Sequence, residues 1–294
     1  DHNLSINGST EKTRYLLSGQ YLNNAGVVEN TGVKRFNYRI NLEADATDWL
    51  TVGARLFNET RKLGTSDFSN ASFYLGATSP GLYPYYNGKY GGSELTQDRS
   101  NNVLTALKQE IGSRTFTLVN SAFYAKAKLL PGLSLDINYN YIKKYNEGNS
   151  YTNPDRRQQT RFSDGTVSTP AGASVGNENL YTGFFNNNSN RQVLEGILRY
   201  NKVIGEKHDI GAILGYNQTK HYEFNSSAKM KGLVDPSAWA PSAAIEKFEI
   251  TGVDGDWSTL STFGRLTYTY DRRYTVEGSF RRDGSSKFAA DSRY

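Results

Sequence analysis

KRFNYRINLEADA, the stretch from Lys34 to Ala46, alternates apolar and polar residues over most of its length. Successive side chains of a β-strand point to opposite faces, so this pattern predicts a strand with one apolar face and one wet face. The apolar face carries Phe36, Tyr38, Ile40, Leu42, Ala44 and Ala46, and the polar face carries Asn37, Arg39, Asn41, Glu43 and Asp45. A strand of this kind separates an apolar environment from water.

The same division recurs along the chain. Residues 133–141 and 260–270 repeat it, and Phe263 alone interrupts the polar face of the second segment. Helical periodicity is hard to find. We therefore predict an all-β protein, an antiparallel up-and-down meander of ten strands. The expected strands are residues 2–8, 14–22, 34–46, 50–62, 114–129, 133–146, 190–203, 208–222, 258–270 and 274–283.

The connections between these strands alternate in length. Those after the odd-numbered strands are short and are built around turn-forming residues such as Leu130-Pro131-Gly132 and Asp271-Arg272-Arg273. Three of the connections after even-numbered strands are long, near residues 63–113, 147–189 and 223–257. In a meander, every short turn lies at one end of the sheet and every long loop at the other, which is the asymmetry of outer-membrane barrels. We predict residues 1–294 to be a segment of such a barrel, with the long loops extracellular.

Composition narrows the function classes. The 34 basic and 29 acidic residues leave a net charge of only +5 with no basic run, so binding to nucleic acid is not predicted. The absence of Cys excludes disulfides, thiol catalysis and thiolate metal sites. The Asp254-Gly255-Asp256 triplet lacks the spacing of a calcium loop. We predict no cofactor, no metal and no enzyme activity.

Several stretches resemble a known family, in order along the chain: residues 2–15, 19–23, 30–37, 39–42, 130–133, 263–268, 273–274 and 282–288. They are similar to barrel strands of SusC/RagA-type TonB-dependent transporters, and Asp283-Gly284-Ser285-Ser286 matches a loop signature of that family. The resemblance implies a Gram-negative outer-membrane importer of glycans or peptides. It also implies contact with outer-membrane lipid, energy from the TonB complex and a SusD-like surface lipoprotein as partner.

Two features depart from the family pattern. The N-terminal plug, through which the TonB complex acts, is not in this sequence, and Ser9 stands where many relatives carry Gly. A family barrel has 22 strands. Ten strands would form about half of its wall, so we expect a mature or truncated product with unpaired first and last strands.

Aromatic residues in the long connections are the candidate substrate contacts, because a flat ring can stack on sugar rings or on apolar peptide side chains. They are Tyr83, Tyr85, Tyr86, Trp239 and Trp257. Anchoring of the loops by these rings is the alternative role. Short helices are expected at 69–77 and 101–108. The inward-facing residues Arg39, Glu43, Asp136, Arg199 and Arg265 are expected to form ion pairs that stabilise the wall, and the alternative is that they line water or contact the plug.

Two other functions stay open at this stage. One is a soluble or surface-exposed all-β glycan-binding module, because alternation also fits a sheet whose apolar face packs on a second layer. The other is an outer-membrane barrel protease, in which His221 would act with Asp254, Asp256 or Asp283.

Overall fold

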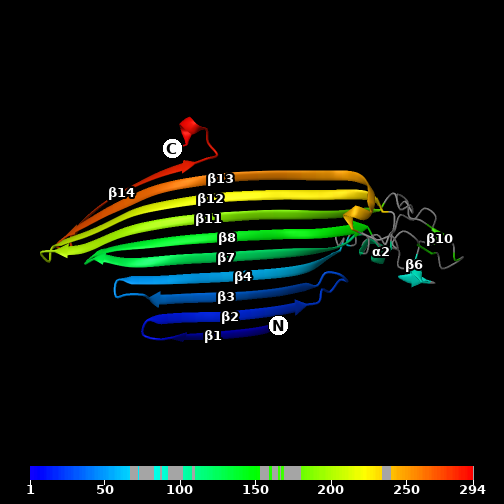
Figure 1. Cartoon of the computed structure of the whole chain (residues 1–294), viewed down its shortest axis with the longest axis horizontal. Coiled ribbons are helices and arrows are strands. Elements are labelled where there is room, and N and C mark those ends of the chain that lie inside the picture. The colour runs from blue at the N-terminus through cyan, green and yellow to red at the C-terminus, as the bar shows by residue number, and fades with distance from the viewer. Residues whose placement is uncertain are drawn as a thin grey trace.

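In a computed structural model of the chain, ten long strands form one antiparallel sheet in the order of the sequence (Figure 1). The structure describes residues 1–66, 72, 83–86, 88–91, 102–107, 110–152, 159–160, 165, 167–168, 180–233 and 240–293. The strands of the sheet are β1 (His2–Ser9), β2 (Thr13–Asn24), β3 (Val33–Asp45), β4 (Leu50–Ser66), β7 (Glu110–Leu130), β8 (Leu133–Thr152), β11 (Tyr181–Ile204), β12 (His208–Leu233), β13 (Ala244–Tyr270) and β14 (Tyr274–Ser285). The predicted meander is confirmed.

The short turns gather at one end of the sheet, and the longer connections at the other (Figure 1). Each short turn contains at most four residues, as in the turn at 271–273 between β13 and β14. Asp271 and Arg272 both have positive φ, 50° and 55°, as the central residues of a type I′ hairpin turn do. Such a turn matches the twist of the flanking strands, so the hairpin closes within three residues.

The strands continue further toward the loop end than the alternation predicts. Six segments expected in the long connections belong instead to strands β4, β7, β8, β11, β12 and β13: residues 63–66, 110–113, 147–152, 181–189, 223–233 and 244–257. Parts of these extensions are polar on both faces, as in Asn186-Asn187-Asn188, so the apolar signal of the strand fades there while the backbone ladder goes on. The predicted bounds of the connections were therefore too wide.

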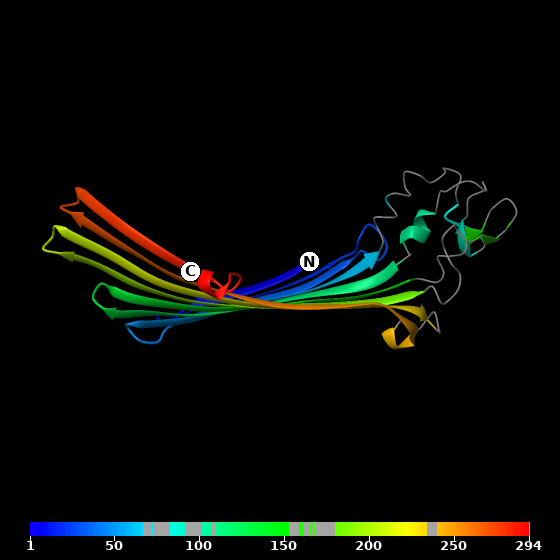
Figure 2. The same cartoon turned by 90° about the horizontal axis from the view of Figure 1, so that it is seen from above.

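Strand register divides the sheet into two faces. On the outer face, apolar residues form a continuous band near the short turns, for example Leu42, Ala54 and Phe123 on neighbouring strands. From one strand to the next, the position of the apolar band shifts along the strand direction, as the stagger of a barrel wall requires. The sheet is curved and twisted rather than flat (Figure 2). The rows between those of the apolar band face inward and carry charged and amide side chains, such as Glu43, Asn138 and Glu195.

No second layer covers the outer band in the part of the chain that is described. Leu4 is 70% exposed, and Leu266 is 57% exposed. The buried apolar residues are few and lie toward the loop end, among them Leu180 and Leu233. A sheet of this length with an uncovered apolar face is suited to lipid rather than to water.

Small elements lie at the loop end. A four-stranded sheet joins β5 (Tyr85–Tyr86), β6 (Lys89–Gly91), β9 (Gln159–Thr160) and β10 (Val167–Ser168). The helix expected at 101–108 is present as α2 (Val103–Leu107), whereas the helix expected at 69–77 lies, except for Ser72, outside the described residues. Short 3₁₀ turns are η3 (Pro241–Ala243) and η4 (Ala290–Ser292). Among the described residues, no helix has the length and apolar character needed to cross a membrane.

Candidate functional site: the inner face and the loop end

One row of the inner face is polar across nearly the whole sheet. Cα pairing places its members side by side on ten successive strands: Ser9, Arg14, Glu43, Gly53, Tyr124, Asn138, Glu195, Asn217, Ser261 and Asp283. Asn138 and Asn217 each donate a long hydrogen bond of 3.4 Å to the Glu195 carboxylate. The row shows that water or polar groups, not hydrocarbon, are the environment of this face.

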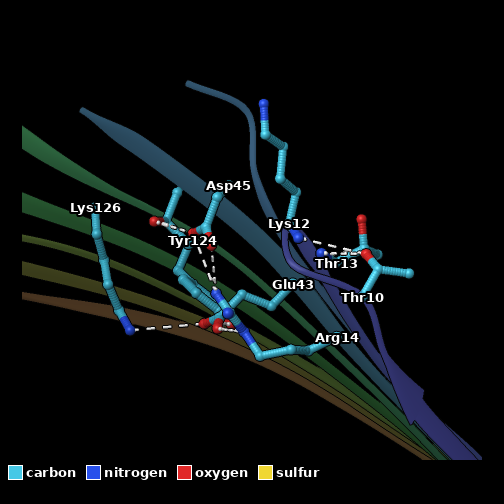
Figure 3. Close-up of polar contacts among 9 residues, drawn as sticks. Thr10, Lys12, Thr13, Arg14, Glu43, Asp45, Tyr124 and Lys126 are labelled. Carbon is cyan, nitrogen blue, oxygen red and sulfur yellow. Dashed lines mark hydrogen bonds and ion pairs between the residues drawn. The ribbon is translucent and has the colours of Figure 1, made fainter. Parts of the chain in front are cut away.

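The strongest contacts of the row join β2, β3 and β7 close to the short turns (Figure 3). Arg14 Nε donates to Glu43 Oε1 at 2.7 Å, and its Nη2 donates to Asp45 Oδ2 at 2.9 Å. The hydroxyl of Tyr124 donates to the other oxygen of Glu43 at 2.6 Å. Lys126 Nζ lies 3.7 Å from that same oxygen. One carboxylate thus links three strands, which fixes their register on the inner face.

Glycines make room for the aromatic residues of this face. A Cβ on Gly53 would overlap the ring of its cross-strand partner Tyr124, and the same holds for Gly215 with Phe263. In each case the ring occupies the space that a Cβ would take. The Arg55 guanidinium carbon is 4.8 Å from the centroid of the Tyr124 ring, so a cation covers the ring. The same arrangement recurs at Gly148, where an added Cβ would overlap the ring of Phe185 and the guanidinium of Arg114 covers that ring.

The predicted inward charges lie on the inner face, and they have different partners. Arg199 forms an ion pair with Asp136, and Glu43 belongs to the network above. Arg39 instead lies over the ring of Phe57, with 5.6 Å between the guanidinium carbon and the ring centroid. For Arg265, no ion pair is found with the residues that the structure describes. Ion pairing is therefore correct for three of the five residues.

A hollow of about 610 Å³ opens on the inner face between β3, β4, β7 and β8. Arg39 and Arg55 line it together with the amides of Asn120 and Asn140. Neither arginine has an acidic partner among the described residues. Sequence reasoning missed this hollow and the contacts of Arg14 and Tyr124, because these side chains meet only through strand pairing.

The loop end holds the predicted aromatic contacts. Tyr83 and Tyr85 are each 48% exposed, and the Tyr85 ring lies 4.9 Å from that of Tyr90. Asn102 is buried, and its Nδ2 donates to the carbonyl oxygens of Tyr83, Pro84 and Gly91 at 2.9–3.2 Å. This single amide anchors the segment that presents the rings. The side chain of Tyr86 and all of Trp239 lie outside the described residues.

Trp257 lies on the inner face of β13 in the ten-stranded sheet, whereas Tyr85 belongs to the four-stranded sheet. The Trp257 ring stacks on His221 at 5.1 Å between centroids, and Lys287 Nζ lies 5.3 Å from the ring centroid. Cα pairing sets Asp254 and Asp256 opposite Phe224 and Tyr222, so their side chains project from the outer face, away from His221. Asp283 shares the inner face with His221, but its cross-strand partner is Ser261 and its carboxylate forms an ion pair with Arg281. The arrangement expected for a protease is therefore not assembled from these residues.

The chain is similar to curated TonB-dependent receptors, although no family model matches it. It is 25% identical over 313 residues to TonB-dependent receptor P3 of Formosa agariphila, which covers 99% of this chain and 28% of that protein. It is also 25% identical over 291 residues to receptor P39 of the same organism, covering 97% of this chain and 26% of that protein. The chain thus spans little more than a quarter of the length of these relatives.

Solved structures agree on the fold. The structure of the RagAB peptide transporter gives a TM-score of 0.76 at 19% identity, over 99% of this chain and 32% of that chain. The open form of Fiu, the ferric-catecholate import receptor of E. coli K12, gives 0.52 at 10% identity, over 96% of this chain and 42% of that chain. The relatives are receptors and transporters, not enzymes. The resemblance in the sequence is thus confirmed: over nearly its whole length the chain is similar to TonB-dependent receptors, and its ten strands have the fold of a section of the RagAB transporter structure.

Proposed function

We propose that this chain forms wall and loops of a transporter that imports oligosaccharides or peptides across the outer membrane, driven by the TonB complex. The observation that carries the proposal is the sorting of the sheet. Its outer face is an uncovered apolar band, its inner face is polar across ten strands, and the longer connections lie at one end. A wall between hydrocarbon and a watery lumen needs this arrangement.

The loop end is proposed to be extracellular and to receive the substrate. Tyr83 and Tyr85 expose about half of their surface there, and Asn102 holds their backbone in place. Rigidly held rings can stack on a sugar or on an apolar peptide side chain with little loss of side-chain entropy. A SusD-like surface lipoprotein is proposed as the partner that covers these loops, and Tyr86, Trp239 and Trp257 remain further proposed contacts.

The substrate class is left as oligosaccharide or peptide. RagAB is named a peptide transporter, and this name refers to the substrate of RagAB alone. The same groups of this chain support an oligosaccharide or a peptide substrate: exposed tyrosines at the loop end, and arginine and asparagine side chains around the inner hollow. These groups bind hydroxyls, amides and carboxylates alike.

Uptake by cells that produce the full-length protein tests the proposal. Fluorescently labelled oligosaccharides from a polysaccharide hydrolysate and labelled peptides from a protein digest are supplied in separate arms, with and without depletion of TonB. We expect one arm to show uptake that is lost with TonB. Uptake in either arm that is independent of TonB, or no uptake in both, would contradict the proposal.

A double variant tests the loop end. Tyr83→Ala with Tyr85→Ala should raise the half-saturating concentration of the transported arm roughly tenfold, the effect of losing about 1.4 kcal/mol of stacking. Tyr274→Ala is the matched control, because Tyr274 is 69% exposed but lies at the short-turn end. Equal effects of the double variant and of Tyr274→Ala would show that Tyr83 and Tyr85 do not contact the substrate.

A further inference from the structure

Two lysines face each other on the outer side of the wall, at the loop end of the hairpin formed by β3 and β4. Lys34 of β3 and Lys62 of β4 are Cα partners in the antiparallel ladder. They share the face of Phe36 and Tyr38, because residues two apart on a strand point the same way. Directly opposite side chains have Cβ atoms about 4.5–5.5 Å apart. The two ammonium groups can therefore converge on one point.

This pairing is unfavourable unless an anion lies between the two charges. Like charges placed directly opposite on a sheet destabilise it. Both lysines are exposed, and neither has a hydrogen bond or ion pair with the residues that the structure describes. The nearest acid in their row is Glu147, two strands beyond Lys62. Two inter-strand spacings amount to about 10 Å, which is too far for an ion pair. Among the described residues, this row therefore supplies no anion beside the two lysines.

The surface just below the two lysines is apolar and aromatic. Tyr21, Phe36 and Tyr38 are 42%, 49% and 39% exposed on the outer face, and the rings of Phe36 and Tyr38 lie 6.3 Å apart. Tyr21 and Phe36 are direct cross-strand partners. The apolar stripe of β3 continues from there to Leu42. A basic pair thus borders an exposed aromatic patch at one edge of the apolar band.

We infer that Lys34 and Lys62 bind the phosphate of an anionic lipid headgroup, while a hydrocarbon chain of that lipid lies against Tyr21, Phe36 and Tyr38. The phosphate neutralises the paired ammonium groups and accepts hydrogen bonds from both. The aromatic patch discriminates a lipid from a free phosphate ion, because only a lipid can cover it. This inference rests on the proposed function, since it requires the outer face to contact the membrane.

Lipid retention measured by native mass spectrometry tests the inference on the full-length protein in detergent. The protein is delipidated and then mixed with phosphatidylglycerol or with phosphatidylcholine. The wild-type protein should retain phosphatidylglycerol in preference to phosphatidylcholine. The double variant Lys34→Gln with Lys62→Gln should weaken phosphatidylglycerol binding about 30-fold, because each lysine near an anionic lipid contributes about 1 kcal/mol. Lys34→Arg with Lys62→Arg should restore it.

Matched controls make each outcome decisive. Lys144→Gln with Lys229→Gln removes the same charge from the inner face and should leave phosphatidylglycerol binding unchanged. Equal losses in this control and in the Lys34/Lys62 variant would overturn the inference, as would unchanged binding in the latter. Displacement of the lipid by excess inorganic phosphate alone would show a free-phosphate site instead. Phosphatidylcholine should stay bound to every variant, and a protein that retains neither lipid would contradict the proposed function itself.

Discussion

Ile137→Arg and Asn138→Arg put the same charge on neighbouring residues of β8 and on opposite sides of the wall. Ile137 is at the centre of the apolar stripe from Leu133 to Tyr141, which extends about 27 Å along the strand. It is 42% exposed on the outer face. Its cross-strand partners are Ala125 and Gly196, which offer an arginine no acceptor. An arginine at this position would therefore enter the hydrocarbon without a partner.

Asn138 belongs to the polar row of the inner face. Its amide already lies 3.4 Å from Glu195 Oε1, and Glu195 is its direct cross-strand partner. An arginine at this position meets a carboxylate and lumen water. Partly exposed ion pairs contribute about 0–1 kcal/mol, so Asn138→Arg should be close to neutral. Ile137→Arg should cost about 2–4 kcal/mol, the range for arginine at the midplane on the lipid face of a barrel.

Urea unfolding of the full-length protein in lipid bilayers measures the difference, and the gel mobility of unheated samples reports how much protein assembles. We expect Ile137→Arg to lower the free energy of unfolding by about 2–4 kcal/mol and to reduce the folded fraction in the membrane. Asn138→Arg should match the wild type in both assays. Equal losses in the two variants, or a larger loss for Asn138→Arg, would refute the assignment of the faces.

Three further predictions concern packing and the loop end. In urea unfolding, Gly53→Ala should lower the free energy of unfolding by about 1–2 kcal/mol more than the control Gly196→Ala does. A Cβ at position 53 would displace the Tyr124 ring, whereas no atom lies within 4 Å of a Cβ at position 196. Equal effects of the two substitutions would contradict the packing of the Tyr124 ring over Gly53. Tyr124→Phe keeps the ring but removes the hydrogen bond to Glu43, and it should cost about 1 kcal/mol in the same assay, whereas an unchanged midpoint would show that this bond contributes nothing. Asn102→Ala removes the amide donor that the carbonyls of Tyr83, Pro84 and Gly91 share, and it should speed proteolytic cleavage between β4 and β7 without changing the unfolding of the sheet. Unaltered cleavage would show that the amide does not anchor this segment.

The residues of the candidate site differ in how far the sequence predicts them. The inward direction of Arg39, Asp136 and Arg199 follows from counting along a single strand, because direction alternates with every residue. Their partners do not follow from counting. Arg199 meets Asp136 across 63 residues of sequence, and Arg39 meets an aromatic ring instead of an acid. The choice of partner depends on cross-strand register and on the diagonal reach of long side chains.

The sequence by itself determined the two faces of the sheet, the strand order and the positions of the short turns, because alternation and turn chemistry are local properties of a few residues. Only the tertiary structure decided how far the strands continue past the apolar band, since backbone pairing persists where both faces are polar. It also decided that Tyr124 lies across Gly53 and reaches Glu43, 81 residues away in sequence. Contacts of this kind form only when distant strands pair, and no local pattern encodes which residues will then lie opposite one another.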